Sequence, residues 1–111
     1  MFEPENRILI VEEQAIVAFD IQSQLEALGY EVVGTASSGV DAVRLAESLR
    51  PDLVLMDVRL DGPMDGVEAA RRIRQICNAP IVFLTAYSDA ATLDRAKLVE
   101  PYGYLVKPWF L

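Results

Sequence analysis

Short apolar runs alternate along the chain with longer stretches in which apolar residues recur every three or four positions. The short runs have the length of β-strands, and we place them at about 7–11, 31–36, 53–56, 80–85 and 104–106. They are largely continuous, and a strand that is apolar on both faces needs cover on both sides. The pattern therefore predicts a parallel sheet with helices on both of its faces, which is a doubly wound α/β domain.

The first helix is expected over about residues 14–28, directly after the first strand. Gly29 fits the position just after its last turn, where glycine adopts a left-handed conformation at little cost. The apolar side chains expected on one face of this helix are Val17, Ile21, Leu25 and Leu28.

The later helices have start and stop signals of their own. The second ends before Pro51, because a residue that precedes proline disfavours helical backbone angles. The third covers about 67–76, where apolar residues recur at spacings of three, and the fourth ends at about Val99. The residues able to cap the second and fourth helices are Ser37 or Ser38, and Ser88 or Asp89.

Composition narrows the chemistry that such a domain can perform. The chain of 111 residues has no histidine, which removes Ser-His and Cys-His nucleophile pairs, histidine zinc sites and a histidine phosphocarrier. Its single cysteine, Cys77, has no partner for an internal disulfide and is expected to be a small packing residue. Any chemistry must therefore use carboxylates, hydroxyls and lysine.

The charge of the chain and its apolar runs bear on partners and location. A net charge of −7 argues against direct binding to nucleic acid, whose phosphates bind basic surfaces. No apolar run approaches the ~20 residues that cross a bilayer, and residues 1–5 lack the basic start of a signal peptide. We therefore expect a cytoplasmic protein with no membrane partner.

Polar residues follow several of the predicted strands, at the edge where the carboxyl ends of parallel strands meet. The residues at these ends are Glu12 and Glu13, Asp57, Thr85 and Lys107. Ligands of open α/β sheets bind at this edge. Carboxylates suit a hard cation such as Mg²⁺, and lysine with a metal can neutralise a phosphoryl group. A carboxylate can also attack phosphorus and become an acyl phosphate.

Each of these residues has a purely structural explanation as well. Asp57 can form a turn, and the two glutamates can be the acidic first turn of a helix. Thr85 can be an ordinary strand residue or a cap, and Lys107 a solvated lysine at a strand exit. Four such coincidences at four strand ends are much less common than any one of them. The convergence therefore favours a functional site.

In its motifs and their spacing the chain resembles the receiver domain of bacterial response regulators over its whole length. The matching segments are 8–13 (ILIVEE), 51–57 (PDLVLMD), 83–86 (FLTA) and 103–108 (GYLVKP). The resemblance implies a flavodoxin-like (CheY-like) sheet of five parallel strands in the order 2-1-3-4-5. It identifies residues 1–111 as one receiver domain that stops before the family's fifth helix.

The resemblance also implies roles for the residues at the strand ends. A sensor histidine kinase or phosphotransfer protein would phosphorylate Asp57 with Mg²⁺ as cofactor, and Thr85 and Lys107 would contact the phosphoryl oxygens. The Lys107-Pro108 peptide would be cis, a form that costs only ~0.5–1 kcal/mol before proline. No enzymatic activity is implied beyond phosphoryl acceptance and slow self-dephosphorylation. The groups implied around the metal are Glu12, Glu13, Asp57 and the backbone carbonyl of Arg59.

Tyr104 stands at the family's aromatic switch position, three residues before the lysine. Aromatic residues are also common in strands for packing reasons alone. The resemblance implies that Thr85 moves toward the phosphoryl group and that Tyr104 turns into the vacated space. The face formed by the fourth helix and fifth strand would then change. A downstream output domain or protein would bind that face, and a homodimer could form through it.

The chain departs from the family pattern in four places. Glu13 stands where a shorter aspartate is usual, and Mg²⁺ requires near-ideal ligand geometry. The loop 58–66 is one residue longer than the common form, and Trp109 replaces a phenylalanine. The sequence stops at Leu111, where the family's fifth helix is expected to begin, which leaves a shortened chain, a further tail or a piece of a longer regulator open.

The resemblance also implies that the positions two residues past the aspartate and the threonine flank the phosphoryl group, and here both are bulky. Arg59 and Tyr87 lie two residues past Asp57 and Thr85. We expect them to hinder the hydrolytic water and to lengthen the phosphorylated state. Equal acyl-phosphate lifetimes in the wild type and in a variant with small residues at both positions would contradict this expectation.

Two other functions stay open. A degenerate receiver could serve as a phosphorylation-independent interaction or dimerisation module, which only Glu13 favours. The second alternative is an enzyme built on a similar sheet. An aspartate-nucleophile phosphatase usually needs Asp-x-Asp, which the sequence at 57–59 lacks, and neither glycine-rich nucleotide motif occurs.

Overall fold

A computed structural model describes residues 6–60, 62–85 and 94–106 of the chain. Within these ranges the strands form one parallel sheet in the order β2-β1-β3-β4-β5. They are β1 Arg7–Val11, β2 Glu31–Ala36, β3 Leu53–Asp57, β4 Ile81–Thr85 and β5 Gly103–Val106. The predicted strands and the order 2-1-3-4-5 are confirmed. The direction of winding changes between β1 and β3, which is where ligands bind in doubly wound sheets.

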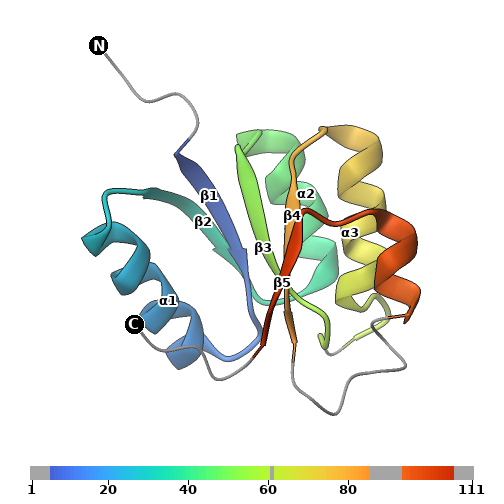
Figure 1. The fold of residues 1–111 in the computed structure, drawn as a ribbon, viewed down its shortest axis with the longest axis horizontal. Helices are drawn as coiled ribbons and strands as arrows, with labels where there is room; N and C mark the ends of the chain where they lie inside the picture. Colours follow the sequence, from blue (N-terminus) through green and yellow to red (C-terminus); the bar gives the residue numbers. More distant parts are fainter. Residues whose placement is uncertain (1–5, 61, 86–93, 107–111) are drawn as a thin grey trace.

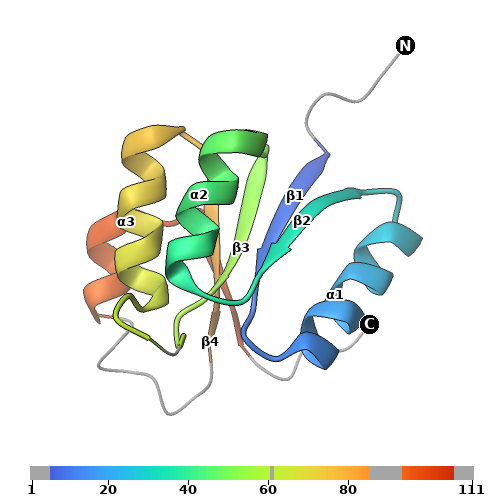
Figure 2. The same cartoon turned by 180° about the vertical axis from the view of Figure 1, so that it is seen from behind.

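Helices cover both faces of this sheet (Figure 1; Figure 2). One face is covered by α1 and the other by α2 and α3, with the helical segment 94–99 beside α3. The bounds are α1 Ala15–Ala27, α2 Gly39–Leu49 and α3 Gly66–Ile76, and residues 94–96 are helical and lead into the 3₁₀ turn η2 Lys97–Val99. The predicted end of the fourth helix at Val99 is confirmed. Its predicted caps, Ser88 and Asp89, lie outside the described residues.

The sheet separates two apolar cores, because successive side chains of a strand point to opposite faces. The core on the side of α2 and α3 includes Leu9, Val11, Met56 and Phe83. The core under α1 includes Ile8, Ile10, Leu55 and Leu84. The partly buried Cys77 packs against the first of these cores, as expected of a packing residue.

The apolar face of α1 is narrower than the sequence predicted. Ile21 is buried, and Val17 and Leu25 pack at the margin of the core. Leu28 is 62% exposed, so its placement on the buried face was wrong. The helix ends at Ala27, and Leu28 is its C-terminal cap rather than part of a further turn.

The helix ends follow their local signals. Ser38, not Ser37, caps α2, because its Oγ accepts the backbone N–H of Asp41 at 3.2 Å. Gly29 has φ +97° after α1, as expected for the residue that follows a helix. No helix within the described ranges is long and apolar enough to span a bilayer.

Candidate functional site

The register of the sheet brings the predicted site residues to one edge. One row of paired residues across β1, β3, β4 and β5 comprises Val11, Met56, Phe83 and Tyr104. Glu12 directly follows β1 and Asp57 is the last residue of β3, so the two stand at the same height at neighbouring strand ends. Thr85 closes β4 one position further on and pairs with Val106. The residue after Val106 is Lys107, which lies outside the described residues.

Buried polarity is concentrated at this edge. Among the described residues, the polar or charged side chains classed as buried are Glu12, Asp57 and Thr85, which are 2%, 4% and 2% exposed. A buried carboxylate costs free energy unless it has partners. No buried side-chain nitrogen or oxygen in the described part of the chain lacks a hydrogen-bond partner. The edge is therefore a supported polar site at the end of an apolar sheet.

Glu12 has a structural role as well as a place in the site. Its backbone N–H donates to the carbonyl of Ala36 at 2.9 Å, which extends the pairing of β1 with β2. Its Oε2 accepts the backbone N–H of Gln14 at 3.1 Å. Gln14 is the N-cap of α1 and makes no side-chain cap of its own. Glu12 therefore places an anion at the positive end of the helix, one of the structural explanations that the sequence left open.

The backbone after Asp57 is held on three sides. Asp57 Oδ1 accepts the backbone N–H of Arg59 at 3.0 Å. The N–H of Val58 donates to the carbonyl of Leu84, and the N–H of Gly66 donates to the carbonyl of Val58, both at 3.1 Å. These bonds tie the Asp57 side chain to its own loop, and the backbone of Val58 to β4 and to the start of α3.

Gly66 packs against the backbone of Asp57 and was missed as a site residue. A Cβ at this position would overlap the carbonyl oxygen of Asp57 and lie 2.8 Å from its carbonyl carbon. It would also lie 2.9 Å from the Cα of Val58. The signal available in the sequence was a glycine directly after Asp65, which caps α3 by accepting the N–H of Glu68 at 2.9 Å.

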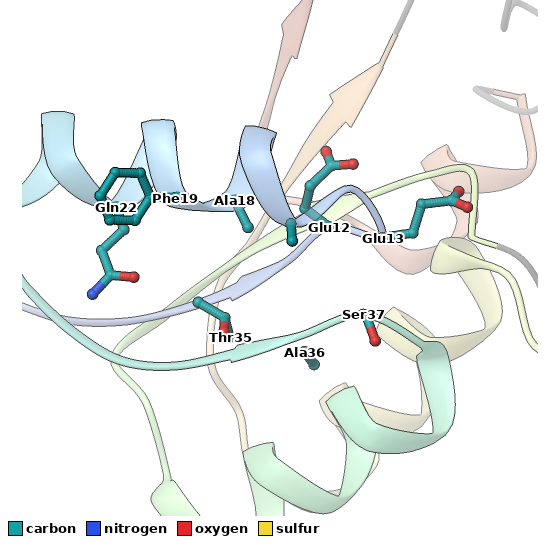
Figure 3. Close-up of a pocket in the computed structure, with 9 residues that line it drawn as sticks. Glu12, Glu13, Ala18, Phe19, Gln22, Thr35, Ala36 and Ser37 are labelled. Atoms are coloured by element: carbon teal, nitrogen blue, oxygen red, sulfur yellow. The ribbon is translucent and has the colours of Figure 1, made fainter.

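A hollow of about 320 Å³ lies beside the acidic pair, between α1 and the end of β2. Figure 3 shows Phe19 and Gln22 of α1 above it and Thr35 and Ser37 below it. Phe19 is 70% exposed at its rim. These lining residues were not predicted, because exposure of an apolar side chain depends on what packs over it.

The carboxylates suit magnesium only in a water-rich arrangement. Within the described ranges, no group of three or more acidic or cysteine side chains is gathered so as to hold a metal ion. Figure 3 shows the side chains of Glu12 and Glu13 leaving the backbone in different directions. Mg²⁺ usually takes one or two carboxylates and fills its shell with waters and phosphate oxygens. Glu12 and Asp57, at neighbouring strand ends, fit that requirement, while the part of Glu13 stays a prediction.

Tyr104 lies on the surface next to the site. Its ring stacks on Phe83 with a centroid separation of 6.1 Å and an interplanar angle of 24°. Tyr104 is 39% exposed, whereas Phe83 is fully buried. The tyrosine therefore rests on the outer side of a residue that stands two positions before Thr85.

Several predicted site residues lie outside the described residues. They are Lys107 and its proline partner Pro108, together with Tyr87 and Trp109. The roles implied for them by the resemblance stay predictions.

The sequence of the chain matches one protein family over most of its length. The family model described as the response regulator receiver domain matches residues 8–110. Transcriptional regulatory protein PdtaR from Mycobacterium tuberculosis is 45% identical over 104 residues, which cover 94% of this chain and 50% of that protein. The chain thus spans about half the length of this curated relative.

Solved structures give the same result. The signal receiver domain of a modulated diguanylate cyclase from Desulfovibrio desulfuricans is 48% identical with a TM-score of 0.88, and the match covers 94% of this chain and 82% of that one. The receiver domain of sensor histidine kinase PA1611 from Pseudomonas aeruginosa is 36% identical with a TM-score of 0.83, over 95% and 87% of the two chains. That structure has a magnesium ion coordinated in its active site cleft.

Proposed function

The chain belongs to the response regulator receiver domain family, and from that premise we propose that it is a phosphorylation-dependent switch whose acceptor is Asp57. The observation that carries the proposal is the burial of Glu12, Asp57 and Thr85 at three neighbouring strand ends. Such clustering of buried polar groups is typical of functional sites.

In the proposed reaction, the Asp57 carboxylate attacks the phosphorus of a phosphorylated donor. The bond from phosphorus to the donor breaks, and Asp57 becomes an acyl phosphate. The N–H of Arg59, which donates to Oδ1 at 3.0 Å, orients the carboxylate. The donor would be a sensor histidine kinase or a phosphotransfer protein. The domain would catalyse nothing beyond its own phosphorylation and slow self-dephosphorylation.

Mg²⁺ would be held by Glu12 and Asp57, together with Glu13 and the backbone carbonyl of Arg59. When bound, the ion would supply positive charge next to the phosphoryl oxygens. Thr85, which is 2% exposed at the end of β4, would donate a hydrogen bond to the same oxygens. Lys107 would pair with them, and its peptide to Pro108 would be cis.

The proposed output face is formed by the helical segment 94–99 and β5. Its exposed apolar and aromatic side chains are Leu98, Tyr104 and Leu105, which are 84%, 39% and 42% exposed. Movement of Thr85 toward the phosphoryl group would let Tyr104 turn inward and change this surface. A downstream output domain or protein would bind there, and the same face could form a homodimer.

The proposed donor contact lies at the other side of the site, on α1. Phe19 is 70% exposed and lines the same hollow as the acidic pair, and Ile16, three positions earlier in α1, is 85% exposed. Large apolar side chains at the rim of a polar site are typical of protein contacts. Contact with a kinase there would bring the donor to Asp57 in the cytoplasm, where we propose that the domain works.

Incubation with acetyl phosphate and Mg²⁺ tests the acceptor assignment. Intact mass spectrometry should detect the gain of one phosphoryl group in the wild type and no gain in Asp57→Asn. A gain that persists in Asp57→Asn would show that Asp57 is not the acceptor.

The divergent side chains of Glu12 and Glu13 favour one alternative, a receiver that acts as a phosphorylation-independent docking or dimerisation module. The same assay distinguishes it, because such a module would gain no phosphoryl group at any Mg²⁺ concentration.

A further inference from the structure

The helical segment 94–99 is attached to α3 by two polar contacts as well as by packing. Ala96 is fully buried in the core on that side of the sheet, and Val99 packs against the same core. Arg74, near the end of α3, donates from Nη1 to the carbonyl of Glu100 at 2.9 Å and to that of Val99 at 3.3 Å. These bonds occupy carbonyls at the helix end, which have no partner within the helix.

The second contact joins the segment to the other end of α3. Arg95 Nη1 lies 2.8 Å from Asp65 Oδ2, and its Nη2 lies 3.5 Å from Oδ1. The nearby Glu68 is already engaged by Arg71 at 2.6 Å and Arg72 at 2.9 Å. Asp65 is therefore the carboxylate that holds Arg95.

The two contacts differ in how easily they can be exchanged. Arg74 binds backbone carbonyls at the C-terminal end of the segment, and these acceptors do not depend on the side chains of the segment. The Asp65–Arg95 pair is a single ion pair whose side chains are 34% and 54% exposed. Pairs of this kind contribute little to stability and are screened by salt. The segment is thus fixed at Glu100 and weakly held at Arg95.

Asp65 is attached in turn to the acceptor. It caps α3 through Oδ1, and the next residue, Gly66, donates its N–H to Val58 and packs directly on Asp57. Arg95, Asp65 and the Asp57 backbone therefore form one continuous path. This path is separate from the proposed Thr85–Tyr104 route, which runs through β4 and β5.

We infer that the Asp65–Arg95 ion pair is a latch that holds the segment 94–99 in the resting arrangement of the switch. The inference rests on the proposed function. In the same structure that contains the ion pair, Tyr104 is 39% exposed. This is the outward position that is expected for the tyrosine before phosphorylation. An interaction made only in the resting arrangement opposes phosphoryl binding, and its removal strengthens that binding by the same factor.

The charge state of the pair agrees with this role. Partial burial raises the pKa of Asp65, but hydrogen bonds from Arg95 and from the backbone of Glu68 and Val67 outweigh it and lower the pKa overall. Asp65 is therefore ionised near neutral pH, and the latch is present under those conditions.

The test measures the affinity for beryllium trifluoride, a phosphoryl analogue, in the presence of Mg²⁺ by isothermal titration calorimetry at low salt. Arg95→Gln removes the cation, and Asp65→Asn removes the charge while keeping a good N-cap. Both should bind the analogue about two- to fivefold more tightly than the wild type, the range of an exposed ion pair. The double variant should bind no more tightly than either single variant.

Lys97→Gln is the matched control, because it removes a positive charge from the same segment. Lys97 Nζ lies 3.7 Å from Asp94 within the segment and makes no ion pair with α3 in the described part of the chain. Its affinity should equal that of the wild type. Equal affinities for Arg95→Gln and Lys97→Gln, or additive effects of Arg95→Gln and Asp65→Asn, would overturn the latch.

Failure of the latch can be told from failure of the proposed function. The wild type could bind the analogue and take a phosphoryl group from acetyl phosphate while Arg95→Gln and Lys97→Gln bind the analogue with equal affinity. In that case only the latch is refuted. If the wild type does neither, the proposed function is refuted and the latch with it. Urea unfolding of each variant shows whether an altered affinity comes from a loss of folded protein.

Discussion

Gly66→Ala tests whether the start of α3 packs against Asp57, the proposed phosphoryl acceptor. Gly66 is the first residue of α3, and helix propensity alone predicts that alanine would stabilise the helix by about 0.5–1 kcal/mol. The structure predicts instead that alanine lowers the free energy of unfolding. The new Cβ would overlap the carbonyl oxygen of Asp57 and lie 2.9 Å from the Cα of Val58. These are backbone atoms, so no side-chain rotation can relieve the overlap.

The size of the effect follows from what has to move. Inserting a methyl group into a packed site costs roughly 1–3 kcal/mol. Moving α3 away also weakens the hydrogen bond from Gly66 to Val58, which is worth about 0.5–1.5 kcal/mol. After the gain in helix propensity, we expect the free energy of unfolding to fall by about 1–3 kcal/mol. For a domain of this size that lowers Tm by roughly 4–13 °C.

Urea unfolding followed by far-UV circular dichroism measures this change. Gly103→Ala is the matched control, because a Cβ at Gly103 would meet nothing within 4 Å. It should leave the free energy of unfolding unchanged or raise it slightly. Phosphoryl uptake from acetyl phosphate should slow at least severalfold in Gly66→Ala, since small displacements of reacting groups are costly. A Gly66→Ala protein as stable and as reactive as the wild type would refute the contact.

Three further predictions concern the cap of α2, the metal site and acid stability. Ser38→Ala should lower the free energy of unfolding by about 1 kcal/mol in urea, because it removes the cap, and an equal loss in Ser37→Ala would contradict this. Glu13→Asp should lower the Mg²⁺ concentration that half-saturates phosphoryl uptake by up to about tenfold, and an unchanged value would place Glu13 outside the metal site. Hydrogen bonds from Arg71 and the arginine after it lower the pKa of Glu68 from 4.5 to about 2. Its contribution to stability is therefore present above pH 4.5 and lost as the pH falls toward 2. Urea unfolding between these values should show a flatter pH dependence for Glu68→Gln, and parallel curves would contradict the assignment.

Most of the fold could be predicted because its signals are local. The strands were found from short apolar runs, and the start of α2 from the serines before it. These patterns depend on residues within a few positions, whose conformations are limited by backbone sterics and side-chain hydrogen bonds. The prediction that Leu28 is buried was wrong for a related reason. Periodicity predicts which face of a helix is apolar, but it does not predict the residue at which the helix ends.

The candidate site could be predicted in part. Glu12, Asp57 and Thr85 were identified from their positions after strands, because parallel strands bring their carboxyl ends to one edge. The structure added what lies around them. The hollow between Phe19 and Thr35 results from how α1 packs on the sheet, and no sequence pattern records it.

The sequence by itself determined the strands and most helix ends, the acidic edge of the sheet and the residue types able to accept a phosphoryl group. Only the tertiary structure decided that Gly66 packs against the carbonyl of Asp57 and that Arg95 reaches Asp65, thirty positions earlier in the chain. The physical reason is that local pattern sets conformation, whereas contacts between distant residues depend on strand register and helix packing. Those contacts connect Asp57, the proposed acceptor, to the segment 94–99 of the proposed output face.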